Sequence, residues 1–346
     1  MDTTIFDVAR RAKVSKSTVS LVVNGSTAVK ESTREKVLKA IREIGYVPNR
    51  AAREMVTAKT GNIGLWIILD EQYSEEPYSF SNLIDSFSHE VSLGVENFIQ
   101  NRRYGLLFSR TSGKVGVQYL PPMIKEHWID GLIVIGGSYD ERLIPIIEQT
   151  NLPSVLVATE VESSIISSIY ANNQEGISKA VDYLVELGHH RIAMLNTHKI
   201  SRNSKVKLKG YLNALERHQL VMRQEWIRES NFTGQSGFEQ TLELFKTNPL
   251  PTAIVCSHDV IALGAMRAIR ERGLRVPEDI SLIGFEDDWL ASYADPPLTT
   301  IRISKKQLGE LAARRIFEYF DSNVTDATKT ALSTQLIVRS SCASPK

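Results

Sequence analysis

The chain has 346 residues, of which 42% are hydrophobic and 23% are charged, and it contains two cysteines. This composition excludes disordered, collagen-like and disulfide-framework proteins. Because no apolar run is long enough to span a bilayer and no signal peptide opens the chain, we expect a cytoplasmic protein with no membrane partner. Its length predicts two or three domains.

Charge is distributed unevenly along the chain. Residues 1–60 carry twelve Lys or Arg and six Asp or Glu, whereas the remainder carries 29 basic and 34 acidic residues. A basic head on a slightly acidic body suggests that the head binds a polyanion. A solvated charged surface explains the same numbers equally well.

Two short helices are predicted first. Thr4 is placed to cap a helix, with Asp7 three residues later as a capping-box variant. Ser15 is a strong cap for a second helix over residues 16–23, which Asn24-Gly25 ends. Helical spacing turns its valines inward and turns Lys16, Ser17, Ser20 and Leu21 outward.

A third helix is predicted over Val37–Ile44, with Ser32 as a possible cap together with Glu35, and Gly45 to Pro48 ends it. Two short helices joined by a tight turn and supported by a third form a helix-turn-helix plan. In that plan the second helix enters the major groove of DNA. A plain three-helix bundle would have the same spacing.

Several segments of the head resemble the lactose/galactose repressor (LacI/GalR) family: Thr4-Ile-Phe-Asp-Val-Ala-Arg-Arg-Ala12, Val14-Ser15, Thr18-Val-Ser20, Val23-Asn-Gly25, Thr33-Arg-Glu-Lys-Val37 and Gly45-Tyr-Val-Pro-Asn-Arg50. The resemblance continues to about residue 340. It implies a sequence-specific transcriptional regulator, most simply a repressor. Such a protein binds a palindromic double-stranded DNA operator as a homodimer and responds to a small-molecule effector.

The resemblance also implies residue roles on DNA. Lys16, Ser17 and Leu21 take base-reading positions, and residues 49–60 form the hinge helix and linker, where Met55 takes the position of an apolar wedge in the minor groove. The full implied DNA-binding set is Thr4, Lys16, Ser17, Thr18, Ser20, Leu21, Asn24, Lys30, Thr33, Asn49, Ala52 and Met55.

Two positions depart from the family pattern. Leu21 stands where many members have an arginine that reads guanine, so Leu21 is suited instead to a thymine methyl group. Lys13 stands where the turn often has glycine, which predicts a strained backbone there. Both departures change the expected operator sequence without affecting the expectation of DNA binding.

Residues 61–340 alternate short β-rich runs with helical segments. This alternation predicts doubly wound parallel α/β sheets. Because residues 61–340 are more than a single hydrophobic core usually organises, we expect two lobes. The family resemblance implies that these lobes are periplasmic-binding-protein-like. We place the first lobe at about 61–160 and 291–320 and the second at about 161–290 and 321–340. The helix-turn-helix domain occupies residues 1–48.

Ligands of such sheets bind beyond the carboxyl ends of the strands, here between the lobes. By resemblance, the effector-binding positions are Asp85, Phe87, Thr159, Lys207, His258 and Glu286. The four polar positions from Thr159 onward differ from the set typical of sugar-binding members, so the resemblance does not imply a common hexose. We expect a sugar or sugar derivative. Cations near residues 197–207 leave a phosphorylated or acidic ligand open, although a solvated rim explains them as well.

The loop over residues 71–84 is longer than in family members. Its aromatic residues would suit a lid over a ligand, and a plain surface loop is an equal alternative.

Other functional classes lack support in the sequence. No P-loop, dinucleotide-binding glycine motif or paired-histidine helix motif is present, so no enzyme, cofactor or metal site is predicted. A solute-binding receptor would share the two lobes, but it would need a signal peptide and would lack the basic head. The head therefore favours a regulator.

Overall fold

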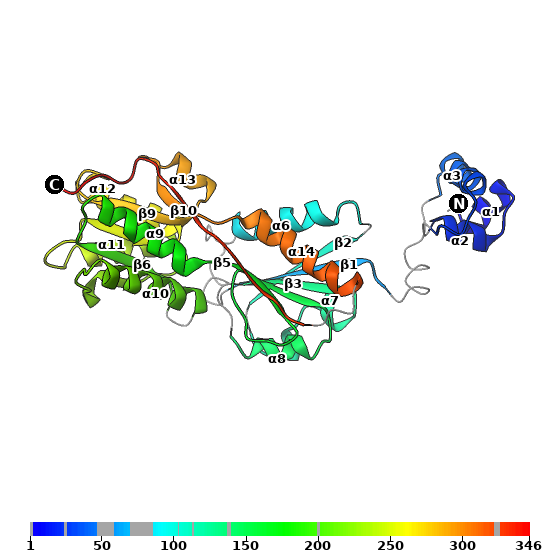
Figure 1. Ribbon diagram of the computed structural model, residues 1–346, viewed down its shortest axis with the longest axis horizontal. Coiled ribbons are helices and arrows are strands. Elements are labelled where there is room, and N and C mark those ends of the chain that lie inside the picture. Colours follow the sequence, from blue (N-terminus) through cyan, green and yellow to red (C-terminus); the bar gives the residue numbers. More distant parts are fainter. Residues whose placement is uncertain are drawn as a thin grey trace. The chain divides into compact units, whose positions relative to one another are not determined.

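The computed structural model describes residues 3–23, 26–46, 59–69, 86–102, 104–112, 114–136, 140–198, 201–321 and 326–346. The chain forms two compact units, Met1–Thr60 and Gly61–Lys346, and each is described by itself (Figure 1). No helix in the described ranges combines the length and apolar character that a membrane span requires.

The described residues of the head form three helices: α1 (Ile5–Ala12), α2 (Lys16–Val23) and α3 (Glu31–Ile44). Two predicted caps are present, because the Asp7 carboxylate accepts from the backbone N–H of Thr4 at 3.0 Å and Ser15 Oγ accepts from the N–H of Thr18 at 3.1 Å. The buried residues that hold the helices together are Val8, Ala9, Val19, Val22, Val37, Ala40 and Tyr46.

The start of the third helix was wrong in the sequence prediction. The helix begins at Glu31 after Lys30, so Ser32 lies inside its first turn and caps nothing. A glutamate in the first turn is favourable beside the positive end of the helix dipole, which explains the earlier start.

The turn between α1 and α2 has the strained backbone that the sequence predicted. Lys13 has φ 54° and ψ 46°, the left-handed conformation, and its N–H bonds back to the carbonyl of Arg10. A glycine would adopt this conformation without the steric cost that the Cβ of lysine brings.

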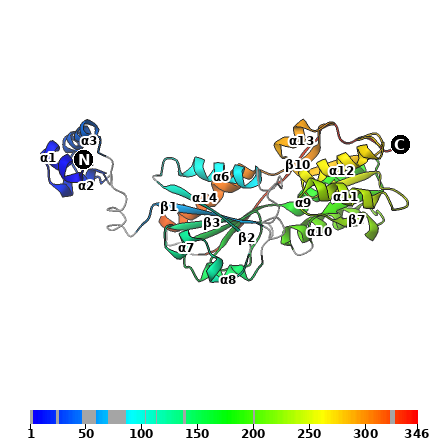
Figure 2. The same ribbon diagram turned by 180° about the vertical axis from the view of Figure 1, so that it is seen from behind.

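The first lobe is built on a six-stranded parallel sheet with the order β11-β5-β4-β3-β1-β2. Its strands are β1 (Asn62–Leu69), β2 (Gly105–Ser112), β3 (Gly131–Ile135), β4 (Ser154–Val157), β5 (Ser167–Ala171) and β11 (Lys329–Leu332). Helices α6 (Ser86–Ile99) and α14 (Lys305–Asp321) cover one face, and α7 (Pro122–Lys125) and α8 (Leu143–Glu148) cover the other (Figures 1 and 2).

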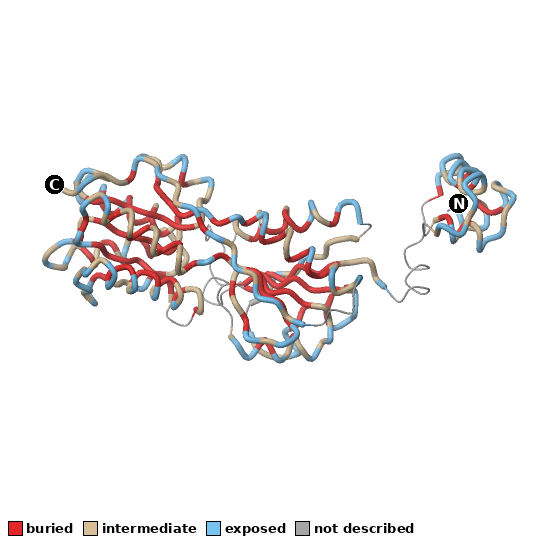
Figure 3. Tube along the Cα trace, viewed as in Figure 1, coloured by how far each residue is buried: buried red, intermediate tan, exposed pale blue. Residues whose placement is uncertain are grey.

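The second lobe repeats the plan with the sheet order β12-β10-β9-β8-β6-β7, in which only the β10–β12 pair is antiparallel. Its strands are β6 (Ile192–Asn196), β7 (Ile227–Glu229), β8 (Ala253–Cys256), β9 (Ser281–Glu286), β10 (Thr299–Arg302) and β12 (Gln335–Ile337). Its helices are α9 (Asn173–Glu186), α10 (Arg202–Arg217), α11 (Gly234–Leu244), α12 (Asp259–Glu271) and α13 (Trp289–Tyr293). Buried residues concentrate in both sheets (Figure 3).

The predicted two-lobe architecture is therefore confirmed, but the crossing points were placed too early. The chain passes between sheets after β5 near residue 172, after β10 near 303 and after β11 near 333. We expected 160, 290 and 320. The strands β5, β11 and β12 are short and partly polar, so the hydrophobic pattern that identifies central strands does not reveal them.

Glycines allow helices to pack closely in both lobes. A Cβ on Gly264 of α12 would lie 1.9 Å from the carbonyl oxygen of Gly234 on α11, and the neighbouring backbone cannot move aside. A Cβ on Gly234 would meet nothing closer than 3.4 Å.

We expect Gly264→Ala to lower the free energy of unfolding by about 3 kcal/mol, because it forces the two helices apart. The matched variant Gly234→Ala should leave stability within about 0.5 kcal/mol of wild type. Urea unfolding of both variants tests this, and equal stability would show that the α11–α12 crossing adapts freely.

Candidate functional site

The exposed side of α2 carries most of the residues predicted to read DNA. Lys16, Ser17 and Leu21 are exposed, and Leu21 has 43% of its surface accessible. Thr18 and Ser20 are half-buried. Thr18 also bonds Ser15 at 2.8 Å between hydroxyls, so it braces the start of the helix.

The remaining predicted contacts on the head are less concentrated. Thr4 and Lys30 are exposed at helix starts, and Thr33 is half-buried on α3. Asn24, Asn49, Ala52 and Met55 lie outside the described residues.

The structure adds Phe6, which sequence reasoning missed. Its ring is 59% exposed, and the Lys16 ammonium lies 4.9 Å from the ring centroid. The available signal was that Phe6 is a large apolar residue next to Ile5, outside the helix face that buries Val8 and Ala9.

A second cluster lies at the carboxyl ends of strands in the second lobe. Lys207 on α10 is buried and donates from Nζ to the backbone carbonyl of Ser257 at 2.7 Å. His258 Nε2 lies 3.4 Å from Lys207 Nζ and 3.5 Å from Glu286 Oε1. Three of the six predicted effector residues therefore meet at one point, where parallel α/β sheets bind ligands.

Burial controls the charges in this cluster. It lowers the pKa of Lys207 to about 8, against the opposing attraction of Glu286 and Asp259. Burial, followed by the charge of Lys207, holds the pKa of His258 well below its ordinary value. His258 is therefore neutral at pH 7, and one ring nitrogen accepts while the other donates.

A neutral His258 can accept a hydrogen bond from Lys207 or present a donor to Glu286. Its Nδ1 lies 3.1 Å from the Ser257 hydroxyl, which can donate or accept. In one tautomer Nε2 accepts from Lys207, and in the other it faces Glu286 as a donor.

The loop after β9 is strained where Glu286 stands. Glu286 has φ 105° and Asp287 has φ 52°, values that side-chain-bearing residues rarely adopt. Asp287 is fixed by Arg302 and Arg339, each at 2.6 Å. Strain held in place by such partners is typical of functional loops.

Asp259, the first residue of α12, anchors the same loop. It is buried, and its carboxylate accepts from the hydroxyl of Thr300 at 2.5 Å and from the N–H of Asp288 at 2.6 Å. The Asp288 carboxylate in turn accepts from the hydroxyl of Ser86 on α6. A continuous set of hydrogen bonds thus joins the second lobe to a helix of the first.

A buried cation lies near this link. Lys305, the first residue of α14, pairs with Glu90 of α6 at 3.1 Å. Against the opposing effect of burial, the negative charges of Glu286 and Asp288 also raise the pKa of Lys305. Lys305 has no local signal in the sequence, because its neighbours come from distant segments.

The first lobe supplies the other predicted effector residues. Thr159 is buried, and its hydroxyl has no hydrogen-bond partner among the described residues. Phe87 packs against the cores of both lobes. No hydrogen bond or ion pair joins either one to Lys207 in the described part of the chain, and Asp85 lies outside it.

Further contacts tie the two lobes together beside Thr159. Arg202 of α10 lies 3.3 Å from the carboxylates of Glu160 and Glu162, which Lys329 also contacts. Asn203 donates to the carbonyl of Ala158 at 3.0 Å. The cations predicted near residues 197–207 are thus partly used in bridging the lobes.

Phe232 is a further residue that the sequence did not single out. Its ring meets the His258 imidazole edge to face, with centroids 4.7 Å apart. It follows β7 in the chain, so it joins the cluster from a different strand.

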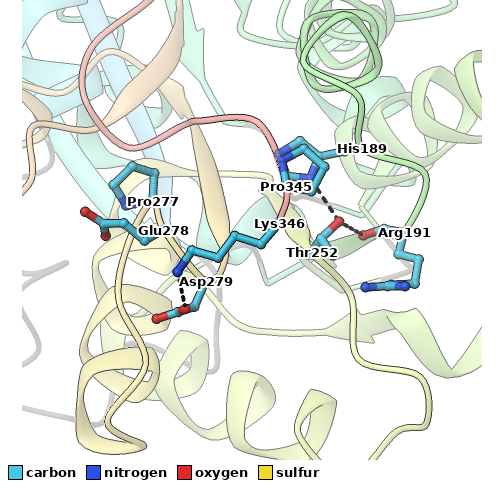
Figure 4. Close-up of a pocket in the computed structure, with 8 residues that line it drawn as sticks. All are labelled: His189, Arg191, Thr252, Pro277, Glu278, Asp279, Pro345 and Lys346. Atoms are coloured by element: carbon cyan, nitrogen blue, oxygen red, sulfur yellow. Dashed lines mark hydrogen bonds and ion pairs between the residues drawn. The ribbon is translucent and has the colours of Figure 1, made fainter.

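The pocket in Figure 4 is a separate feature. It lies at the amino ends of β6, β8 and β9, and its lining includes His189, Thr252 and Lys346. His189 is buried and bonded to Thr252, Ser281 and the carbonyl of Ala343, which gives it a structural role. No group of metal-binding side chains occurs in the ranges that the structure describes.

Two family models match the chain. The model of "Bacterial regulatory proteins, lacI family" matches residues 4–49, and that of the "Periplasmic binding protein-like domain" matches residues 181–342.

Curated relatives match nearly the full length. The HTH-type transcriptional repressor PurR of Actinobacillus pleuropneumoniae serotype 3 (strain JL03) is 36% identical, with 91% of this chain and 90% of that protein covered. The probable HTH-type transcriptional repressor ExuR of Bacillus subtilis (strain 168) is 31% identical, with 98% of each covered.

Solved structures agree with these relatives. A lac repressor dimer bound to operator and the anti-inducer ONPF is 28% identical with a TM-score of 0.82, and the match covers 99% of this chain and 100% of that one. A complex of the transcriptional regulator CelR with cellobiose is 28% identical with a TM-score of 0.73, covering 98% and 99%. The helix-turn-helix head, the two-lobed body and the full-length relatives together show that this chain belongs to the lacI family of bacterial regulatory proteins.

Proposed function

We propose that the protein is a DNA-binding transcriptional repressor whose affinity for its operator is controlled by a small molecule bound between the lobes. The observation that carries this proposal is the pairing, in one chain, of a helix that exposes Lys16, Ser17 and Leu21 with a polar cluster at the strand ends of a two-lobed body. We place the activity in the cytoplasm, where operator DNA is found.

On DNA, Lys16 donates to a base edge, and Leu21 contacts a thymine methyl group. The hydroxyls of Ser17 and Ser20 lie on the same side of α2, with Thr4, Thr18, Asn24, Lys30 and Thr33 set to contact or support the backbone. Residues 49–60 complete the DNA contacts as a hinge, with Met55 as the minor-groove wedge.

For the effector, Lys207, His258 and Glu286 supply polar contacts from the second lobe. Phe87 and Thr159 contribute from the first lobe together with Asp85. Because Glu286 already brings a carboxylate to this cluster, a neutral polyhydroxyl ligand suits the site better than a phosphate.

The protein acts as a homodimer, because a palindromic operator presents two identical half-sites. Sedimentation of the purified protein should give twice the chain mass of 38.8 kDa.

Operator binding is tested with Lys16→Ala. Each good base contact contributes about 1–3 kcal/mol, and a symmetric operator has two, so affinity should fall about thirtyfold or more at fixed salt. Lys39→Ala, which removes an exposed cation of α3, is the matched control. The measurement is fluorescence anisotropy with a duplex selected from a random library, and an unchanged affinity would remove Lys16 from the reading surface.

Effector binding is tested by thermal unfolding against sugars, sugar phosphates, polyols and nucleobases. A ligand at 100 times its dissociation constant adds about 2.7 kcal/mol of stability. Repeating the titration with operator DNA gives the sign of the coupling, which must be reciprocal.

A further inference from the structure

The contact between Phe6 and Lys16 sets Lys16 apart from other cations of the head. Arg10, Arg11 and Lys39 each pair with a carboxylate of the head, whereas the Lys16 ammonium lies over an aromatic ring. A carboxylate would neutralise the ammonium and compete with DNA for it. A ring attracts the ammonium while leaving its full charge available.

The exposure of Phe6 is not explained by the core of the head. The buried side of α1 is formed by Val8 and Ala9, and Phe6 lies outside that cluster. This side chain is 59% exposed and is therefore available for a contact outside the core, here with the Lys16 ammonium.

We infer that Phe6 is a positioning residue for base reading, because its ring holds the Lys16 ammonium at the start of α2 against one base position in the major groove. The inference rests on the proposed function of Lys16. A lysine is a compact charge on a flexible four-carbon chain, so without a guide it divides its time between phosphates and base edges. A guided ammonium meets the O6 and N7 acceptors of a single guanine.

The test compares two variants of the full-length protein, one without an aromatic ring at position 6 and one with it. Phe6→Leu keeps an apolar side chain and removes the aromatic face, whereas Phe6→Tyr keeps the face. Wild type first selects duplexes from a random library, which defines the half-site and the guanine assigned to Lys16 by its loss in Lys16→Ala. Base preference and affinity are then measured for each variant at fixed salt.

Phe6→Leu should reduce the preference for that guanine about fivefold or more and leave the preferences at other positions unchanged. Phe6→Tyr should stay within about twofold of wild type at every position. In the Lys16→Ala background, Phe6→Leu should change affinity less than twofold, since no ammonium remains to be positioned. Leu38→Ala, which removes another exposed apolar side chain of the head, should have no effect.

The inference is overturned if Phe6→Leu keeps the wild-type guanine preference. It is also overturned if Phe6→Leu weakens Lys16→Ala as strongly as it weakens wild type, because the ring would then contact DNA independently. Failure of the wild-type protein to select any sequence would instead overturn the proposed function, and the inference with it. Equal thermal midpoints for the Leu and Tyr variants confirm that both heads are folded.

Discussion

Replacing Glu286 by glutamine is expected to abolish the effect of the effector on operator affinity, while affinity without effector stays within about twofold of wild type. The substitution keeps the shape of the side chain and the same demand on the strained backbone at φ 105°. It removes the negative charge that faces His258 Nε2. A hydrogen bond from the effector to the charged Glu286 carboxylate contributes about 1.5–3 kcal/mol. The coupling free energy between two binding sites is usually of about the same size, so the loss of this one bond is enough to remove the response.

The measurement is operator affinity with and without the compound that the thermal panel identifies. Glu278→Gln is the control, because Glu278 lies at the pocket beside the amino ends of the strands, away from the cluster. A full response in Glu286→Gln would show that the effector does not depend on this carboxylate.

The sequence predicted the head better than the body for a physical reason. Helices depend on local signals, so the cap at Ser15 and the strained turn at Lys13 could be read from neighbouring residues. The two-lobed fold followed from the alternation of strands and helices. The positions where the chain crosses between the sheets could not be predicted in the same way. β5 and β12 are short strands, and their pairing with β11 and β10 joins segments that are far apart in the chain.

The candidate effector site shows the same division. Lys207, His258 and Glu286 were assigned by family resemblance, and the structure brings them together. Phe232 and Lys305 carry no local signal, because only tertiary packing brings them to the loop after β9 or to His258. Side chains that act through long-range contacts therefore need the structure to be found.

Asp259 is another such residue, and its two partners lie 29 and 41 positions away. Burial raises its pKa to about 8, opposed by the bonds from Thr300 and Asp288. The charge of Glu286 adds to the rise and that of Lys305 opposes it. The protonated acid keeps both bonds, because its O–H donates to the Thr300 hydroxyl while its other oxygen accepts from Asp288.

We therefore expect the free energy of unfolding of wild type, relative to Asp259→Asn, to fall as pH rises from about 4 to about 8. The asparagine imitates the protonated acid, with its NH₂ facing Thr300 and its carbonyl facing Asp288. Between these pH values the folded state holds the proton and the unfolded state does not, so wild type loses up to about 1.4 kcal/mol per pH unit. Summed from about pH 4 to about pH 8, this loss is a large part of the free energy of unfolding of about 5–15 kcal/mol that is typical of a domain.

Urea unfolding of the two proteins at pH 4 to 8.5 measures this difference directly. Asp259→Ala is the companion variant, because it loses both hydrogen bonds and should be less stable than Asp259→Asn at every pH. A difference between wild type and Asp259→Asn that stays constant over this range would mean that Asp259 is ionised in the folded protein despite its burial. The loop that carries Glu286 and Asp288 would then be anchored by a charge rather than by a neutral acid, and Lys305 would be the cation that balances it.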